Sequence, residues 1–175
     1  LTTSPAAGED AGPIFVVLGH DNAALEDSLG VVAVRALEVG DDNLSLAVYG
    51  RPQAAPQAQV VAEARAGTTI ERIHAQPEVA AGEVLVLDLA MQGDLRDSRR
   101  ISLRIVDAAG NNIAQNDQVV AESVTAGLFV PPATAPGAYR LAAVLYDLPD
   151  MAPLTDGDKS PEIELMEIAV LPPPG

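Results

Sequence analysis

The sequence predicts a mainly β chain, in which a seven-stranded antiparallel immunoglobulin-like β-sandwich follows a small β-α-β-β unit. Three observations lead to this prediction. Short apolar segments recur at near-regular spacing after residue 56, 14 glycines and 14 prolines are spread between them, and aromatic residues make up only 3% of the chain. Val, Leu, Ile and Ala must therefore fill the core. A length of 175 residues suffices for one buried core with a small appendage.

The first 51 residues are expected to form a flexible linker, 1–12, and then the small unit, 13–51. The linker is small and polar in composition, whereas Ile14–Leu18 is a continuous apolar run of the kind found in buried strands. A short helix is predicted over Ala23–Leu29, because Asp21 or Asn22 can cap its start and Gly30 can end it. The remaining strands of the unit are predicted at Val31–Val39 and Leu44–Tyr49.

The segment 51–57 carries two prolines and interrupts every periodicity, so we place a domain boundary there and the β-sandwich at 56–172. Seven strands are predicted in this second domain. They are Ala58–Ala64, Thr68–His74, Glu83–Met91, Arg100–Asp107, Gln118–Thr125, Ala138–Tyr146 and Ile163–Leu171.

Alternation of apolar and polar residues shows which faces of these strands are buried. Ile101, Leu103 and Ile105 share one face of their strand, with polar residues between them. Leu85, Leu87, Leu89 and Met91 also share one face of their strand. Tyr139, Leu141, Ala143 and Leu145 share one face of theirs. In the segment Gly137–Asp147 the opposite face also carries Val144 and Tyr146, which is typical of a central strand.

The formal charge of −15 argues against a nucleic-acid partner, because such a protein needs a basic surface to displace counterions from phosphates. No apolar run approaches the roughly 20 residues that span a bilayer, so direct membrane insertion of this chain is not expected. The absence of cysteine excludes disulfides and thiolate metal sites within these residues.

Four acidic residues late in the chain form the candidate metal site: Asp147, Asp150, Asp156 and Asp158. Carboxylate oxygens on a loop are suitable ligands for Ca²⁺, which takes six to eight oxygens. Their spacing differs from that of the twelve-residue calcium loop, and solvated turn residues are the competing interpretation. The sequence suggests no cofactor other than calcium.

No catalytic residues emerge from the motifs. The two histidines, His20 and His74, lack the spacing of a zinc site, and Ser28 lacks the Gly-x-Ser-x-Gly surroundings of a hydrolase nucleophile. A pair of carboxylates for glycoside hydrolysis stays open as an alternative, because the separation of two acids is set in three dimensions.

Several motifs carry a family resemblance. Val106-Asp107-x-x-Gly110-Asn111, Ala135-Pro136-Gly137-x-Tyr139-x-Leu141 and Leu145-Tyr146-Asp147 occur in this order. With these motifs, residues 68–171 resemble the C-terminal extracytoplasmic domain of bacterial membrane glycosyltransferases of the dolichyl-phosphate-mannose:protein mannosyltransferase type. Residues 13–51 resemble the segment before that domain. The tryptophan and Pro-Gly-Glu step expected near 121–125 are absent, so no binding role is carried over for that loop.

The resemblance implies a non-catalytic, extracytoplasmic accessory domain at the cell surface or on the periplasmic side of a bacterial membrane. Its partners would be the rest of a membrane-anchored parent chain and an acceptor or a glycan. The catalytic acid of such enzymes belongs to a membrane loop outside this sequence, so none is assigned here. The alternative is a stand-alone cell-surface β-sandwich that binds carbohydrate or protein.

Overall fold

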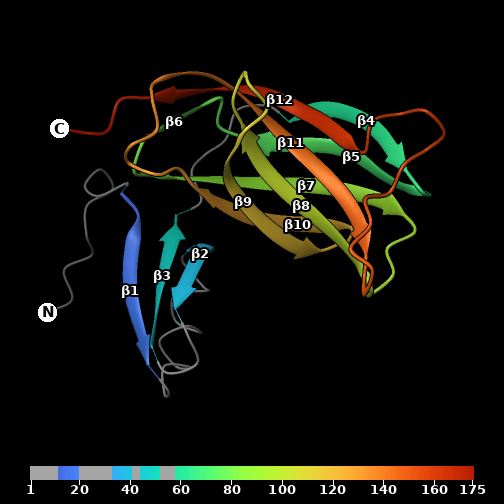
Figure 1. Ribbon diagram of the computed structural model, residues 1–175, viewed down its shortest axis with the longest axis horizontal. Helices are drawn as coiled ribbons and strands as arrows, with labels where there is room; N and C mark the ends of the chain where they lie inside the picture. The colour runs from blue at the N-terminus through green and yellow to red at the C-terminus, as the bar shows by residue number, and fades with distance from the viewer. Residues whose placement is uncertain (1–11, 20–32, 41–43, 52–57) are drawn as a thin grey trace, which may run out of the picture.

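The computed structural model describes residues 12–19, 33–40, 44–51 and 58–175, which contain twelve strands and no helix (Figure 1). The strands are β1 (Ile14–Gly19), β2 (Val34–Gly40), β3 (Leu44–Gly50), β4 (Gln59–Arg65), β5 (Thr68–Ala75), β6 (Glu78–Ala80), β7 (Val84–Gly93), β8 (Arg99–Val106), β9 (Asn112–Val119), β10 (Ser123–Phe129), β11 (Gly137–Asp147) and β12 (Glu162–Leu171). The helix predicted at Ala23–Leu29 lies outside the described residues. Within them, no helix long and apolar enough to cross a bilayer is found.

The first three strands form a separate antiparallel sheet in the order β1-β3-β2. One of its faces has a small core of its own, in which Ala33, Ala47 and Tyr49 are buried and Ile14 and Val16 pack against them. In Figure 1 this sheet lies below the rest of the molecule, and its strands cross the direction of β7. The three strands predicted for this part of the chain are confirmed.

Strands β4 to β12 form two sheets, here called the two-sheet unit. The four-stranded sheet has the order β10-β7-β5-β4, and the five-stranded sheet has the order β6-β12-β11-β8-β9. All neighbours are antiparallel except the short β6, which is parallel to β12. The prediction of a mainly β chain with antiparallel sheets is thus confirmed.

The two sheets enclose one hydrophobic core between them. Strand β7 contributes Leu85, Leu87, Leu89 and Met91, each at most 3% exposed, as its alternation predicts. On the facing sheet, Ile101, Leu103 and Ile105 of β8 are fully buried. Strand β11 lies between β12 and β8, and Leu141, Ala143 and Leu145 fill the core, so its predicted central place and inward face are confirmed.

Residues 58–175 hold nine strands, two more than the seven predicted. The predicted strand Gln118–Thr125 is wrong: its residues span the end of β9, a turn, and the start of β10, which belongs to the other sheet. No strand was predicted over residues 112–117, which make up most of β9. The edge position of β9 explains the error, since five of its eight residues are polar and no apolar alternation marks it.

The turn between β8 and β9 forms as its residue types predict. Asp107 accepts hydrogen bonds at Oδ1 from the main-chain N–H groups of Ala109 (2.9 Å) and Asn111 (2.8 Å). Gly110 has a φ of 87°, which a residue with a side chain rarely adopts. The side-chain amide of Asn111 also donates to Oδ2 of Asp107, at 2.8 Å. This bond contributes most to lowering the pKa of the Asp107 carboxyl, and the main-chain bonds add to it.

The three-stranded sheet rests on the outer face of β7 and β10 through small residues. A Cβ at Gly50 would lie 2.4 Å from Cγ1 of Val84, and a Cβ at Gly127 would lie 3.0 Å from Cβ of Ala36. Glycine at both positions therefore permits the close approach of the two parts. Beside them, the rings of Phe15 and Phe129 meet edge to face with centroids 6.1 Å apart.

Candidate functional site

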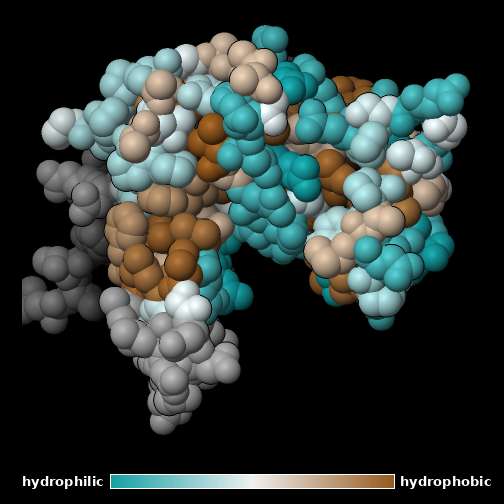
Figure 2. All heavy atoms as spheres, in the orientation of Figure 1, coloured by the Kyte–Doolittle hydropathy of each residue, from teal (hydrophilic) through white to brown (hydrophobic). Residues whose placement is uncertain are grey.

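A polar groove lies where the three-stranded sheet meets the two-sheet unit, between β2 and β9, with β10 beneath. We call it the β2–β9 groove; its volume is about 560 Å³. Figure 2 shows the hollow between the two parts and hydrophilic side chains beside it. The groove is lined by Val34, Arg35, Ala36, Leu37, Glu38, Gln115, Asn116, Asp117, Gln118 and Thr125.

Asn116 joins all three sheets at the bottom of this groove. Its side-chain Nδ2 donates to the main-chain oxygen of Gly127 on β10 (2.7 Å) and to that of Arg35 on β2 (3.3 Å). Its Oδ1 accepts a 2.8 Å hydrogen bond from Nε2 of Gln118. Asn116 and Gln118 occupy the inward face of β9. A strand in the middle of a sheet would carry apolar residues at these positions. Here the two polar side chains form hydrogen bonds with carbonyl and amide groups at the sheet edges.

The β2 wall is held by a charged pair. Nη1 of Arg35 lies 2.7 Å from Oε2 of Glu38, and Oε1 of Glu38 accepts a 2.8 Å hydrogen bond from the hydroxyl of Ser45 on β3. Both charged side chains are about half exposed, at 51% and 42%. The pair therefore contributes little to stability but keeps two hydrogen-bonding groups in place along the groove.

The β9 wall is made by amide and carboxylate groups. Nε2 of Gln115 donates to both carboxylate oxygens of Asp117, at 3.2 and 3.3 Å. The hydroxyl of Tyr146, from the outer face of β11, also donates to Oδ2 of Asp117 at 3.3 Å. Burial raises the pKa of the Tyr146 phenol, and the neighbouring Asp117 charge adds to that shift. The carboxylate of Asp117 thus stays exposed and accepts hydrogen bonds from two neutral groups, while the charges of Arg100 and Arg104 on β8 act on the Tyr146 phenol in the opposite direction to Asp117.

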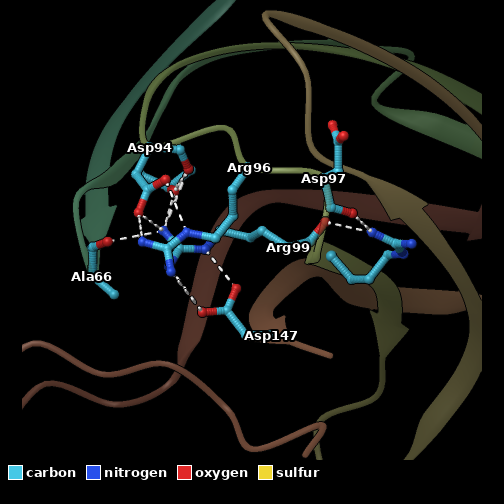
Figure 3. Close-up of polar contacts among 8 residues, drawn as sticks. Ala66, Asp94, Arg96, Asp97, Arg99 and Asp147 are labelled. Atoms are coloured by element: carbon cyan, nitrogen blue, oxygen red, sulfur yellow. Dashed lines mark hydrogen bonds and ion pairs between the residues drawn. The ribbon is translucent and has the colours of Figure 1, made fainter. Parts of the chain in front are cut away.

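A second polar cluster lies near the ends of β8 and β11, around the buried guanidinium of Arg99, which is 2% exposed (Figure 3). Nε and Nη2 of Arg99 donate to the two carboxylate oxygens of Asp147, at 2.9 and 3.0 Å. Nη1 donates to the main-chain oxygen of Ala66 (2.9 Å) and to Oγ1 of Thr68 (2.7 Å). These bonds tie β8 and β11 to the β4–β5 turn on the opposite sheet.

Asp147 is therefore an ion-pair partner of Arg99 in this structure. The hydrogen bonds from Arg99 hold the pKa of the Asp147 carboxyl below its ordinary value, and the charges of Arg99 and Arg96 act in the same direction. The pKa of the nearby Asp94 carboxyl is also lowered, chiefly because Arg96 donates a hydrogen bond to it. The paired donors satisfy both oxygens of Asp147 in a bidentate arrangement.

The other three candidate calcium ligands are dispersed along the loop between β11 and β12. Asp156 accepts a 3.0 Å hydrogen bond from the main-chain N–H of Ala66, while Asp150 and Asp158 are exposed. Among the described residues, no group of three or more histidine and acidic side chains is arranged to hold a metal ion. The structure thus gives Asp147 and Asp156 different partners: Asp147 binds Arg99, and Asp156 binds the main chain of Ala66, whose oxygen Arg99 also contacts.

The remaining residues weighed from sequence fall in different places. His74 lies on β5, half-buried and in register with Asp88 of β7. His20 and Ser28 lie outside the described residues. Elsewhere in the two-sheet unit, Glu162 and Glu164 at the start of β12 both approach Nη1 of Arg140, at 3.4 and 3.6 Å.

The groove residues and Arg99 were missed from sequence. A usable signal for the groove was the run of amide and acidic residues from Asn111 to Gln118, which is unusually rich in side chains that both donate and accept hydrogen bonds. No signal marked Arg99, since Arg99 and Arg100 are identical neighbours and only the register of β8 decides which one is buried.

Compared with known proteins, the chain matches no family model and no curated protein sequence.

Proposed function

We propose that this chain is a non-catalytic, extracytoplasmic interaction domain of a glycosyltransferase-like membrane protein, and that the β2–β9 groove is its binding surface. The family resemblance of residues 68–171 supports the cellular setting. The groove itself supports the binding role, because fixed polar side chains from strands of all three sheets converge on one recess. In this setting the domain positions an acceptor or a glycan for the membrane-embedded part of its parent chain.

We infer further that the two-sheet unit is an immunoglobulin-like sandwich, extended by β4 and β6. In the immunoglobulin order, the first, second and fifth strands share one sheet and the third, sixth and seventh share the other. Strands β5, β7 and β10 correspond to the first group, and β8, β11 and β12 to the second. Strand β9 follows β8 within the same sheet, as the added strand of variable-type domains does.

The observation that carries the binding proposal is the way Asn116 and its neighbours are held. Gln115, Asn116, Gln118, Arg35 and Glu38 each make side-chain hydrogen bonds that fix their orientation before any ligand arrives. A ligand that enters the groove then meets preformed donors and acceptors, and less conformational freedom is lost on binding.

The binding role is tested with the 175-residue chain on a glycan array, followed by calorimetric titration of each hit. Arg35→Ala and Gln118→Ala remove groove side chains, and Glu167→Ala on the outer face of β12 is the matched control. We expect saturable binding that the groove variants weaken and the control leaves unchanged. Binding that all three variants leave intact would place the ligand elsewhere on the molecule.

The cellular setting is tested separately by the full-length gene product. Several long apolar segments upstream of Leu1 would agree with a multi-spanning parent enzyme. A simple secretion signal directly upstream would contradict the membrane parent, and with saturable glycan or protein binding it would point to a stand-alone cell-surface binding domain.

A further inference from the structure

We propose that the open edge of β9 binds an extended, basic polypeptide segment, which adds a sixth strand to the five-stranded sheet. This inference rests on the proposed function, because it takes the β2–β9 groove to be a binding surface. It adds the class of ligand, which is a basic polypeptide. Strand addition is a common way in which β-sheet domains recognise peptides, since main-chain hydrogen bonds supply affinity and side chains supply selectivity.

Strand β9 is the least protected edge of the two-sheet unit. Proteins usually block exposed sheet edges with a bulge, a very short strand, a proline, a lysine or a covering segment. The β4 edge has a register shift between Val60 and Glu63, with Ala62 at a φ of 53°, and β6 has only three residues. The β10 edge approaches β2, whose Ala36 closely faces Gly127. Strand β9 runs for eight residues without proline or lysine, and its register shift lies near its start, at Ile113, so the stretch from Ala114 to Val119 is regular.

The ladder between β8 and β9 shows which main-chain groups of β9 face outward. The N–H of Val120 donates to the oxygen of Arg99 at 3.3 Å, and hydrogen-bonded pairs alternate along an antiparallel ladder. Continuing this alternation in the observed register, the main-chain groups of Asn116 and Gln118 face β8. Those of Gln115 and Asp117 therefore point to the open edge, where an added strand would bind.

The groove admits one strand rather than a whole sheet. Its second wall is β2, and the side chain of Asn116 spans from β9 to the oxygen of Arg35 on that wall. A second copy of this chain would need to bring a complete sheet edge alongside β9, which β2 obstructs. A single extended segment is only one strand thick, so it can lie alongside β9 without bringing a whole sheet with it.

The charge of the groove favours a basic segment. Arg35 and Glu38 neutralise each other, so Asp117 supplies the net charge of the lining residues. Its carboxylate is exposed and accepts hydrogen bonds only from the neutral groups of Gln115 and Tyr146 among the described residues. The chain as a whole carries −15, which draws cationic ligands and repels anionic ones.

The test uses the full chain and an acetylated, amidated peptide of about seven residues, the length of an ordinary strand, in which lysine alternates with valine and threonine. One comparison peptide has glutamate for lysine, and another has N-methyl groups on alternate residues, which remove its edge donors. Affinity is measured by calorimetry, and amide hydrogen exchange of β9 is followed by NMR. Gln115→Pro and Asp117→Asn alter the edge, and Val60→Lys on the exposed β4 edge is the control.

We expect the lysine peptide to bind and to protect the amides of Gln115 and Asp117 from exchange. N-methylation, Gln115→Pro and the glutamate peptide should each weaken binding by roughly tenfold or more, Asp117→Asn several-fold, and Val60→Lys not at all. Binding that N-methylation does not affect, or protection outside β9, overturns strand addition. Glycan binding without peptide binding overturns this inference and leaves the proposed function standing, while binding of neither contradicts both.

Discussion

The side-chain amide of Asn116 donates a 2.7 Å hydrogen bond to the main-chain oxygen of Gly127, and so joins the edge of the five-stranded sheet to the edge of the four-stranded sheet. The same nitrogen reaches the oxygen of Arg35 on the three-stranded sheet, at 3.3 Å. One amide thus satisfies carbonyl groups of two other sheets. The contact sets both the closure of the core at this end and the floor of the β2–β9 groove.

Replacing Asn116 with leucine should therefore destabilise the chain. The carbonyl of Gly127 would lose its partner in a partly buried setting, and an unsatisfied group of this kind costs about 1–3 kcal/mol. We expect a lower urea midpoint and faster amide exchange in β2. The control is Asn112→Ala, which removes an exposed amide bonded to Gln115 and should have little effect. Equal stability of the two variants would contradict the bridging role.

Removing the guanidinium of Arg99 should have a larger effect. Arg99→Met leaves the Asp147 carboxylate without its bidentate partner. Breaking a buried ion pair from one side costs about 3–5 kcal/mol, and we expect a loss near the lower end because the Asp147 side chain is 30% exposed. The double variant Arg99→Met/Asp147→Leu should recover part of this loss, because it also removes the unpaired charge. Arg96→Met is the control, with a side chain 54% exposed, and should change stability little. Additive losses in the double variant would argue against a coupled pair.

Acid should destabilise the chain partly through Asp147. The pKa of this carboxyl is lower in the folded chain than in the unfolded chain, mainly because Arg99 donates to it. The folded state therefore gains stability above the unfolded pKa of about 3.9 and loses it as pH falls through the folded pKa. Urea midpoints measured from neutral pH to below pH ~3 should fall less steeply in Asp147→Asn than in the parent chain. Parallel curves would show that other carboxyls, such as Asp94 and Asp107, carry the effect.

A methyl group at Gly50 should disturb the seating of the three-stranded sheet. Its Cβ would lie 2.4 Å from Cγ1 and 2.6 Å from Cβ of Val84, which no small rotation relieves. Overpacking of this kind costs about 1–3 kcal/mol. We expect Gly50→Ala to raise amide exchange in β2 and β3 before it affects β8 or β11. Adding Val84→Gly removes both of these atoms and should restore part of the protection in β2 and β3; failure to do so would contradict the contact.

Calcium should leave the melting temperature unchanged. The oxygens of Asp147 already accept hydrogen bonds from Arg99, whose positive charge opposes a divalent cation at this position. Thermal unfolding with and without about 1 mM CaCl₂, near the dissociation constants of extracellular calcium modules, checks this. A rise with calcium that magnesium does not reproduce, and that Asp156→Asn abolishes, would instead establish the loop as a calcium site.

The sequence by itself determined the strands with an apolar face. Leu85, Leu87 and Leu89 alternate with residues of the opposite face, and this period of two can be read locally because one side of the strand is buried. The turn at Asp107–Gly110 was equally local, since one carboxylate accepting main-chain N–H groups and one glycine define it.

Only the tertiary structure decided the edges and the polar sites. Strand β9 has no apolar period, because Asn116 and Gln118 use its inward face to bind one another and carbonyl groups that other strands bring near. Arg99 is buried and Arg100 is not because of the register between β8 and β11, which aligns Arg99 with Asp147. Such partners lie 11 to 81 residues apart along the chain, and a local pattern contains no information about contacts of that range.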